Sequence, residues 1–147
     1  MYPKQLLSEV HWGFYGGRRP CQEEFIQEVT EYNKELNKEW NPNDTVLNYP
    51  NVTILYSYWN TKRNNVEEKS FDLAASNQSG FTAGELMYKI HNQVVDRLEN
   101  EDFRFFEGLT LWKIKNEKNI HPKTPLYFIN QTDLKYQGGN IIECGDD

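Results

Sequence analysis

The clearest local signal in the sequence is a helix start in the hexapeptide FTAGEL at residues 81–86. The hydroxyl of Thr82 can accept a hydrogen bond from the backbone N–H of Glu85, and the Glu85 carboxylate can bond back to the N–H of Thr82. Phe81 can pack against Leu86 as a hydrophobic staple. An apolar face then continues at Leu86, Met87, Ile90, Val94 and Leu98. The pattern predicts a helix of about four turns that begins at Thr82.

A second helix is predicted between Pro20 and Trp40, because apolar residues recur there at steps of three or four. These residues are Phe25, Val29, Tyr32, Leu36 and Trp40. The opposite face is acidic: residues 22–40 contain six Glu and two Lys, which sum to −4. Pro20 suits the first turn of a helix and Pro42 cannot continue one, so these two prolines bound the segment.

Four segments rich in β-branched and aromatic residues are predicted to be strands. They are Val52–Trp59, Val66–Ala74, Leu109–Ile114 and Leu126–Asn130. A polar turn at residues 61–65 joins the first two into a hairpin. The first is apolar on both faces, with Val52, Ile54, Tyr56 and Tyr58 on one side and Leu55 and Trp59 on the other. We therefore expect it to be a central strand and its hairpin partner to be half exposed.

The remaining segments are predicted to connect these elements. Residues 45–47 form a short extended piece, and residues 115–125 form a long hairpin loop. Residues 6–19 fit either a helix or a strand, and residues 131–147 fit either a loosely held acidic tail or a short edge strand. Together, the predicted helices and strands indicate one α+β domain over residues 1–147. It has an antiparallel sheet of about four to five strands and two main helices packed on one face.

The composition narrows the classes of function. The chain has 147 residues and a net charge of −6, and 14% of it is aromatic. The aromatic side chains supply a core despite a mean hydropathy of −0.84. The negative net charge argues against nucleic-acid binding, because that binding depends on Lys and Arg side chains that neutralise phosphates. No apolar run is long enough to span a membrane, and no secretory signal precedes Ser8. Two cysteines are too few for a disulfide framework. We therefore expect a cytoplasmic protein.

Residues that could carry catalysis are sparse. The histidines, His11, His91 and His121, lie too far apart in sequence to give a metal-ligand motif, and we expect neither a metal nor a cofactor. A small enzyme that uses Cys21 with His11 or His91 is one alternative, because a helix N-terminus lowers the pKa of a thiol. We expect instead that Cys21 is a partly buried turn residue and that His91, near the middle of its helix, lies at the edge of the apolar face or in solvent.

Basic residues gather in predicted turns, at Arg18-Arg19, at Lys62-Arg63 and at four lysines between residues 113 and 123. A small-ligand or nucleic-acid adaptor is therefore a second alternative, which the net charge disfavours.

Binding to another protein fits the surface composition better. The acidic helix and the acidic C-terminal end would steer a basic partner into encounter, and exposed aromatic residues would anchor it. We expect the exposed aromatic residues to include Tyr2, Trp12, Tyr15, Tyr56, Tyr58 and Trp59. The candidate partner-binding residues are Glu24, Glu28, Glu31, Glu35, Tyr56, Tyr58, Trp59, Asp146 and Asp147.

Three short runs carry a resemblance to a known class of protein. They are GELMYKIHN at residues 84–92, FFEGL at 105–109 and PLYF at 125–128. Over roughly residues 80–130 the chain resembles small bacterial immunity proteins of polymorphic or contact-dependent toxin systems. The resemblance implies a cytoplasmic inhibitor without catalytic residues that binds one toxin domain and blocks its active site or substrate groove. Because this chain is acidic, we expect the toxin domain to be basic and to be a nuclease.

Overall fold

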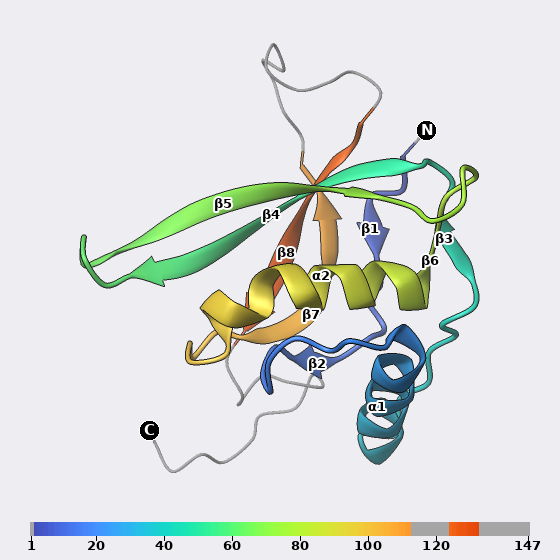
Figure 1. The fold of residues 1–147 in the computed structure, drawn as a ribbon, viewed down its shortest axis with the longest axis horizontal. Coiled ribbons are helices and arrows are strands. Elements are labelled where there is room, and N and C mark those ends of the chain that lie inside the picture. The colour runs from blue at the N-terminus through green and yellow to red at the C-terminus, as the bar shows by residue number, and fades with distance from the viewer. Residues whose placement is uncertain (1, 113–123, 133–147) are drawn as a thin grey trace.

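The structure, a computed structural model, describes residues 2–112 and 124–132 and has an α+β fold, as the sequence predicts (Figure 1). The helices are α1 (Gln22–Glu35) and α2 (Ala83–Leu98). The strands are β1 (Gln5–Leu6), β2 (Trp12–Gly13), β3 (Thr45–Leu47), β4 (Asn51–Asn60), β5 (Asn65–Ala74), β6 (Phe81–Thr82), β7 (Phe105–Leu111) and β8 (Leu126–Thr132). The predicted loop at 115–125 and the predicted tail at 131–147 lie almost wholly outside the described residues.

Six strands form the main sheet, in the order β1-β7-β8-β4-β5, with β2 also paired to β7. The two strands beyond the predicted four come from the N-terminal segment, whose structure the sequence left open: β1 pairs Gln5 with Thr110, and β2 pairs Trp12 with Phe106. All pairs are antiparallel except β4 with β8, which is parallel. The parallel pair departs from the predicted antiparallel sheet. Parallel neighbours require a crossover connection, and β5, β6, α2 and β7 lie between β4 and β8 along the chain. β3 and β6 form a second, two-stranded sheet.

The predicted hairpin is present as β4 and β5, and its register extends from Asn51 opposite Ala74 to Asn60 opposite Asn65. β4 is a central strand, as predicted. β5, predicted to be half exposed, is the edge strand of the sheet, and Leu73 is its one buried residue. β7 begins four residues before the predicted Leu109. Gly108, at φ +99°, lies in an irregularity between Phe106 and Leu109 that shifts the register without ending the strand.

The start of α2 is partly as predicted. The Thr82 hydroxyl accepts a hydrogen bond from the Glu85 N–H at 3.1 Å. The Glu85 carboxylate bonds elsewhere: it accepts from the N–H and hydroxyl of Ser76, both at 2.7 Å, and pairs with Lys89 at 2.8 Å. Burial alone would raise the pKa of Glu85, but these hydrogen bonds outweigh it and hold that pKa below its usual range. The capping interaction therefore ties the helix start to the chain that precedes β6.

The first helix ends five residues before the predicted Trp40. Asn37 adopts a left-handed conformation with φ 59°. The N–H of Asn37 bonds to the Lys34 carbonyl at 3.0 Å, and the N–H of Lys38 bonds to the Asn33 carbonyl at 2.8 Å. This pair of bonds is a Schellman motif, which closes a helix and redirects the chain. Leu36 and Trp40 continue the helical spacing of apolar residues in the sequence, although the backbone leaves the helix after Glu35.

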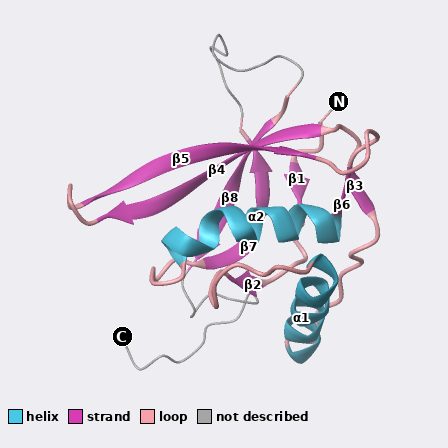
Figure 2. Ribbon diagram, viewed as in Figure 1, coloured by secondary structure: helices cyan, strands magenta, loops and turns pink. Residues whose placement is uncertain are grey.

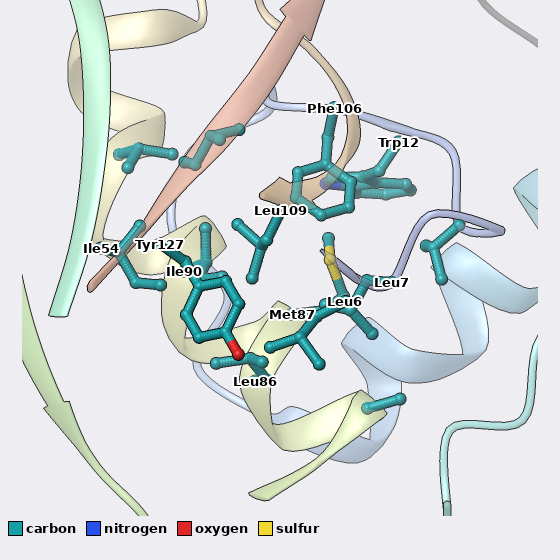
Figure 3. Close-up of a cluster of buried hydrophobic side chains, with 14 of the residues drawn as sticks. Leu6, Leu7, Trp12, Ile54, Leu86, Met87, Ile90, Phe106, Leu109 and Tyr127 are labelled. Carbon is teal, nitrogen blue, oxygen red and sulfur yellow. The ribbon is translucent and has the colours of Figure 1, made fainter. Parts of the chain in front are cut away.

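Both helices lie on one side of the main sheet, but only α2 crosses it (Figure 2). Helix α1 packs against α2 and β2 instead of the sheet face. The helices approach closely at Gly84, where an added Cβ would lie 2.5 Å from Cδ1 of Ile26. The main core forms between α2 and the sheet, where Leu86 and Ile90 meet Leu109 and Tyr127 (Figure 3). The opposite face of the sheet has no helix on it among the described residues.

Candidate functional site

The uncovered face of the main sheet contains a groove where two neighbouring strands separate. The parallel pairing of β4 with β8 covers only Thr53–Leu55 with Leu126–Phe128. Beyond it, β4 continues to Asn60 with β5 as its partner, and the hairpin turns away from β7 and β8 (Figure 1). The gap between the strands is therefore set by backbone topology.

The side chain of Gln131 bridges the separating strands. Its Oε1 accepts a hydrogen bond from the Ser57 N–H at 2.9 Å, and its Nε2 donates to the Ser57 carbonyl at 3.0 Å. The same Nε2 lies 3.2 Å from the carbonyl of Phe103, in the connection between α2 and β7. The side-chain amide thus takes the place of the missing backbone ladder and gives the groove a polar floor.

The sheet-face groove, as we name this depression, has a volume of about 560 Å³. Its lining is mostly apolar and includes Leu55, Val66, Phe103, Trp112 and Phe128. The rings of Trp112 and Phe128 contact edge to face, with centroids 5.8 Å apart. Val66 is 54% exposed and Trp112 is 43% exposed. Large apolar side chains this exposed and this close together are typical of interaction surfaces.

A second hollow adjoins the groove at Phe103, which lines both. This hollow has a volume of about 290 Å³ and is lined by Trp59, Asn100, Glu101 and Asp102 as well. Trp59 is 40% exposed. An exposed indole therefore lies in the same hollow as two carboxylates.

The charge that the described strands contribute to this face is negative. Glu68 lines the groove, and Asp72 follows on the same side of β5, where its carboxylate accepts a hydrogen bond from Thr53 at 2.6 Å. Within β4, β5, β7 and β8, which are described in full, Lys69 is the one basic residue. Lys69 stands opposite Tyr56 on the helix side of the sheet. The four strands thus contribute carboxylates and no cation to the groove side.

The predicted glutamates of the first helix form a separate surface. Glu24, Glu28, Glu31 and Glu35 are all exposed on α1, whose five Glu and one Lys sum to −4. Glu28 pairs with Arg19, whose Nε lies 2.9 Å from its Oε1. Helix α1 lies at the opposite end of the molecule from the tip of the β4–β5 hairpin (Figure 1). The structure therefore does not bring the predicted glutamates of α1 and Trp59 together.

The prediction that Tyr56 is exposed is wrong, because its side chain is 3% exposed. It alternates with Val52 and Ile54 toward α2, and burial raises the pKa of its hydroxyl. Tyr58, on the same side, is half-buried under the Arg97 guanidinium, which lies 4.6 Å from the ring centroid. Of the three predicted β4 residues, Trp59 alone faces the groove side.

Other predicted contact residues fall elsewhere. Trp12, expected to be exposed, is 2% exposed and belongs to the core. Tyr15 is 42% exposed, as expected. Asp146 and Asp147 lie outside the described residues. Tyr2 is half-buried.

The histidine that the sequence predicts to be at the edge of the apolar face of its helix or in solvent, His91, is fully buried. His91 Nδ1 accepts a hydrogen bond from the Trp12 indole N–H at 3.1 Å, and its Nε2 lies 2.9 Å from the Gly17 carbonyl. This arrangement requires the proton on Nε2. Burial lowers the pKa of His91 to about 4. Both ring nitrogens are thus engaged in holding the N-terminal segment to α2.

The remaining candidates for catalysis do not converge. His11 Nδ1 lies 3.9 Å from Glu107 Oε2, beyond hydrogen-bond reach, and burial lowers the pKa of this histidine. Cys21 is the half-buried N-cap residue of α1, and its side chain makes no capping bond. Within residues 2–112 and 124–132, no group of three or more His, Cys, Asp or Glu is arranged to hold a metal ion.

The groove was not predicted from the sequence, although part of it could have been. Pairing the hairpin from its turn places Val66 opposite Trp59 and Glu68 opposite Ser57, and residues opposite each other share a face. The contribution of Trp112 and Phe128 depends on the parallel pairing of β4 with β8, which no local pattern encodes.

Neither helix of the described chain is both long and apolar enough to cross a membrane. No protein-family model, curated protein or solved structure matches the sequence or fold of this chain.

Proposed function

We propose that this chain is a cytoplasmic inhibitor of the bacterial immunity type, which binds a basic, nucleic-acid-cleaving toxin domain and blocks its active site. The observation that carries the proposal is the sheet-face groove with its adjoining hollow, where exposed aromatic side chains lie beside carboxylates. Nucleases bind phosphates through cationic surfaces, and such a surface is complementary to an acidic one.

The two kinds of residue make different contributions to binding. Trp59 and Trp112 supply large, stiff contact areas, and tryptophan is enriched among residues that dominate interface affinity. The carboxylates mainly accelerate encounter and select against acidic partners. The exposed glutamates of α1 and the net charge of −6 extend the negative field beyond the groove.

The test is inhibition of the nuclease activity of the toxin domain encoded beside this chain. We expect cleavage of a DNA or RNA substrate to stop at an equimolar amount of inhibitor. A non-cognate nuclease domain of similar charge is the control and should remain active. Undiminished cleavage at a large excess of the chain would contradict the proposal. Direct binding of the chain to the oligonucleotide substrate would support the adaptor alternative in its place.

A further inference from the structure

We infer that the partner inserts an extended segment with basic and apolar side chains into the sheet-face groove, and that one of its cations stacks on Trp59 against Glu101 and Asp102. This inference rests on the proposed function and identifies the docking surface and the chemistry of the segment that occupies it.

The size and form of the site suit a short segment of chain. The groove of about 560 Å³ and the hollow of about 290 Å³ share Phe103 in their linings, so they are neighbours. The first volume alone is within the range of binding pockets. Its sides are strands whose separation is held by the Gln131 bridge, so the groove exists before a partner arrives. Preformed sites lose less conformational entropy on binding.

The apolar part of the occupant follows from the apolar lining. Trp112 and Phe128 form one wall, and Val66 projects from the edge strand on the other side. Covering these side chains removes apolar surface from water, which favours association. Leu-like side chains at alternate positions would point into the groove when the segment is extended.

The basic part of the occupant follows from charge complementarity. Glu68 lines the groove, and Glu101 and Asp102 share the adjoining hollow with Trp59. A guanidinium over an indole gains a cation–π interaction, and carboxylates beside it can accept its N–H groups. Arginine fits this combination better than lysine because its planar group can stack and donate at once.

Beside the acidic face of α1, the exposed aromatic residue is Tyr15, whose ring stacks on Trp12 with centroids 6.0 Å apart. The groove and the hollow together expose more apolar surface, from Trp59, Val66 and Trp112.

The glutamates of α1 are exposed, but Glu28 is already paired with Arg19. The nearby Trp40 is half-buried, and its indole N–H donates to the Thr30 hydroxyl at 2.9 Å. We therefore assign docking to the groove and only long-range attraction to α1.

The four tryptophans make the inference testable by NMR, because each indole N–H reports on a different place. Trp59 reports on the hollow, Trp112 on the groove, Trp40 on the surface near α1, and Trp12, bonded to His91, on the core. The probe is a synthetic eight-residue peptide that alternates Arg and Leu, titrated into the ¹⁵N-labelled full chain. An alternating Glu and Leu peptide is the control.

We expect the Arg-Leu peptide to shift the indole signals of Trp59 and Trp112 and to leave those of Trp12 and Trp40 in place. The double substitution Glu101→Lys and Asp102→Lys should weaken peptide binding by about tenfold. The matched control, Glu31→Lys and Glu35→Lys on α1, makes the same charge change and should have a much smaller effect. An unchanged Trp12 signal shows that each variant is folded.

Three results would overturn the inference: shifts at Trp40 in place of Trp59 and Trp112, no shifts at any indole, or equal weakening by the two charge-reversed variants. The proposed function fails on a different result. If the peptide binds in the groove but the nuclease is not inhibited, the inhibitor proposal is wrong and the groove assignment stands. If the nuclease is inhibited equally by the wild type and by the Glu101→Lys, Asp102→Lys variant, the groove assignment is wrong.

Discussion

At the scale of single residues, His91 connects parts of the chain that are distant in sequence. Its Nδ1 accepts from Trp12 and its Nε2 lies beside the Gly17 carbonyl, so the neutral ring satisfies both groups. Protonation would place a second donor opposite the Trp12 N–H and a positive charge near Arg19, whose Nη1 lies 3.4 Å from Nε2. The fold therefore depends on an uncharged His91.

This dependence predicts a loss of stability in mild acid. Burial lowers the pKa of His91 from 6.5 to about 4, so between these values the unfolded chain binds a proton that the folded chain does not. The free energy of unfolding should fall by about 3 kcal/mol between pH 6.5 and pH 4 from this residue alone. Urea unfolding of the wild type and of His91→Gln at several pH values measures it. Parallel pH profiles for the two proteins would contradict the prediction.

Gln131 is the second residue whose role can be isolated. Gln131→Ala removes the acceptor for the Ser57 N–H and the donor to its carbonyl. We expect a loss of about 1–2 kcal/mol in stability and faster hydrogen exchange at the Ser57 amide. Asn130→Ala is the neighbouring control, because the Asn130 side chain bonds to Thr110 and not to β4. Unchanged protection of Ser57 in Gln131→Ala would show that the bridge does not hold the strands.

At the scale of elements, the hydroxyl of Thr82 is the cap on which the start of α2 depends. Thr82→Ala should lower the free energy of unfolding by about 1 kcal/mol, because the Glu85 N–H loses its acceptor. Thr82→Ser keeps the oxygen and should retain most of the stability. The midpoints of urea unfolding compare the three proteins. Equal losses in Thr82→Ala and Thr82→Ser would mean that the methyl group, and not the hydrogen bond, is responsible.

The elements that sequence predicts well are those whose signals are local. The cap at Thr82 and the period of α2 lie within one segment, and the polar turn at 61–65 sets the hairpin register. Helix α1 extends less far than its apolar period because Asn37 takes a left-handed conformation. The short strands β1 and β2 could not be predicted, since two residues carry no period and their pairing with β7 is distant in sequence.

The candidate site was harder to predict than the fold for the same reason. Exposure of Trp59 follows from alternation, but alternation alone does not say which face the helices cover. The sequence therefore placed Tyr56 at the surface, whereas α2 buries it. The groove itself requires the separation of β4 from β8, which results from the order of strands in the sheet.

At the scale of the whole molecule, the two acidic surfaces are distinct. The groove and its adjoining hollow combine carboxylates with exposed indoles, while α1 presents glutamates far from the hairpin tip along the long axis (Figure 1). A partner bound in the groove would interact with α1 mainly through the electrostatic field of the α1 glutamates. Fields of exposed charges are screened by salt over about 8 Å at physiological ionic strength, whereas apolar contacts are not. Affinity for a basic partner should therefore fall with salt to a plateau and not to zero.

The most direct measurement of the central claim is calorimetric titration of this chain with the purified toxin domain at low and high salt. The proposed function predicts a one-to-one complex with a dissociation constant of about 10 nM or below at low salt, and a weaker but measurable complex at high salt. A dissociation constant above about 1 μM at low salt would contradict it.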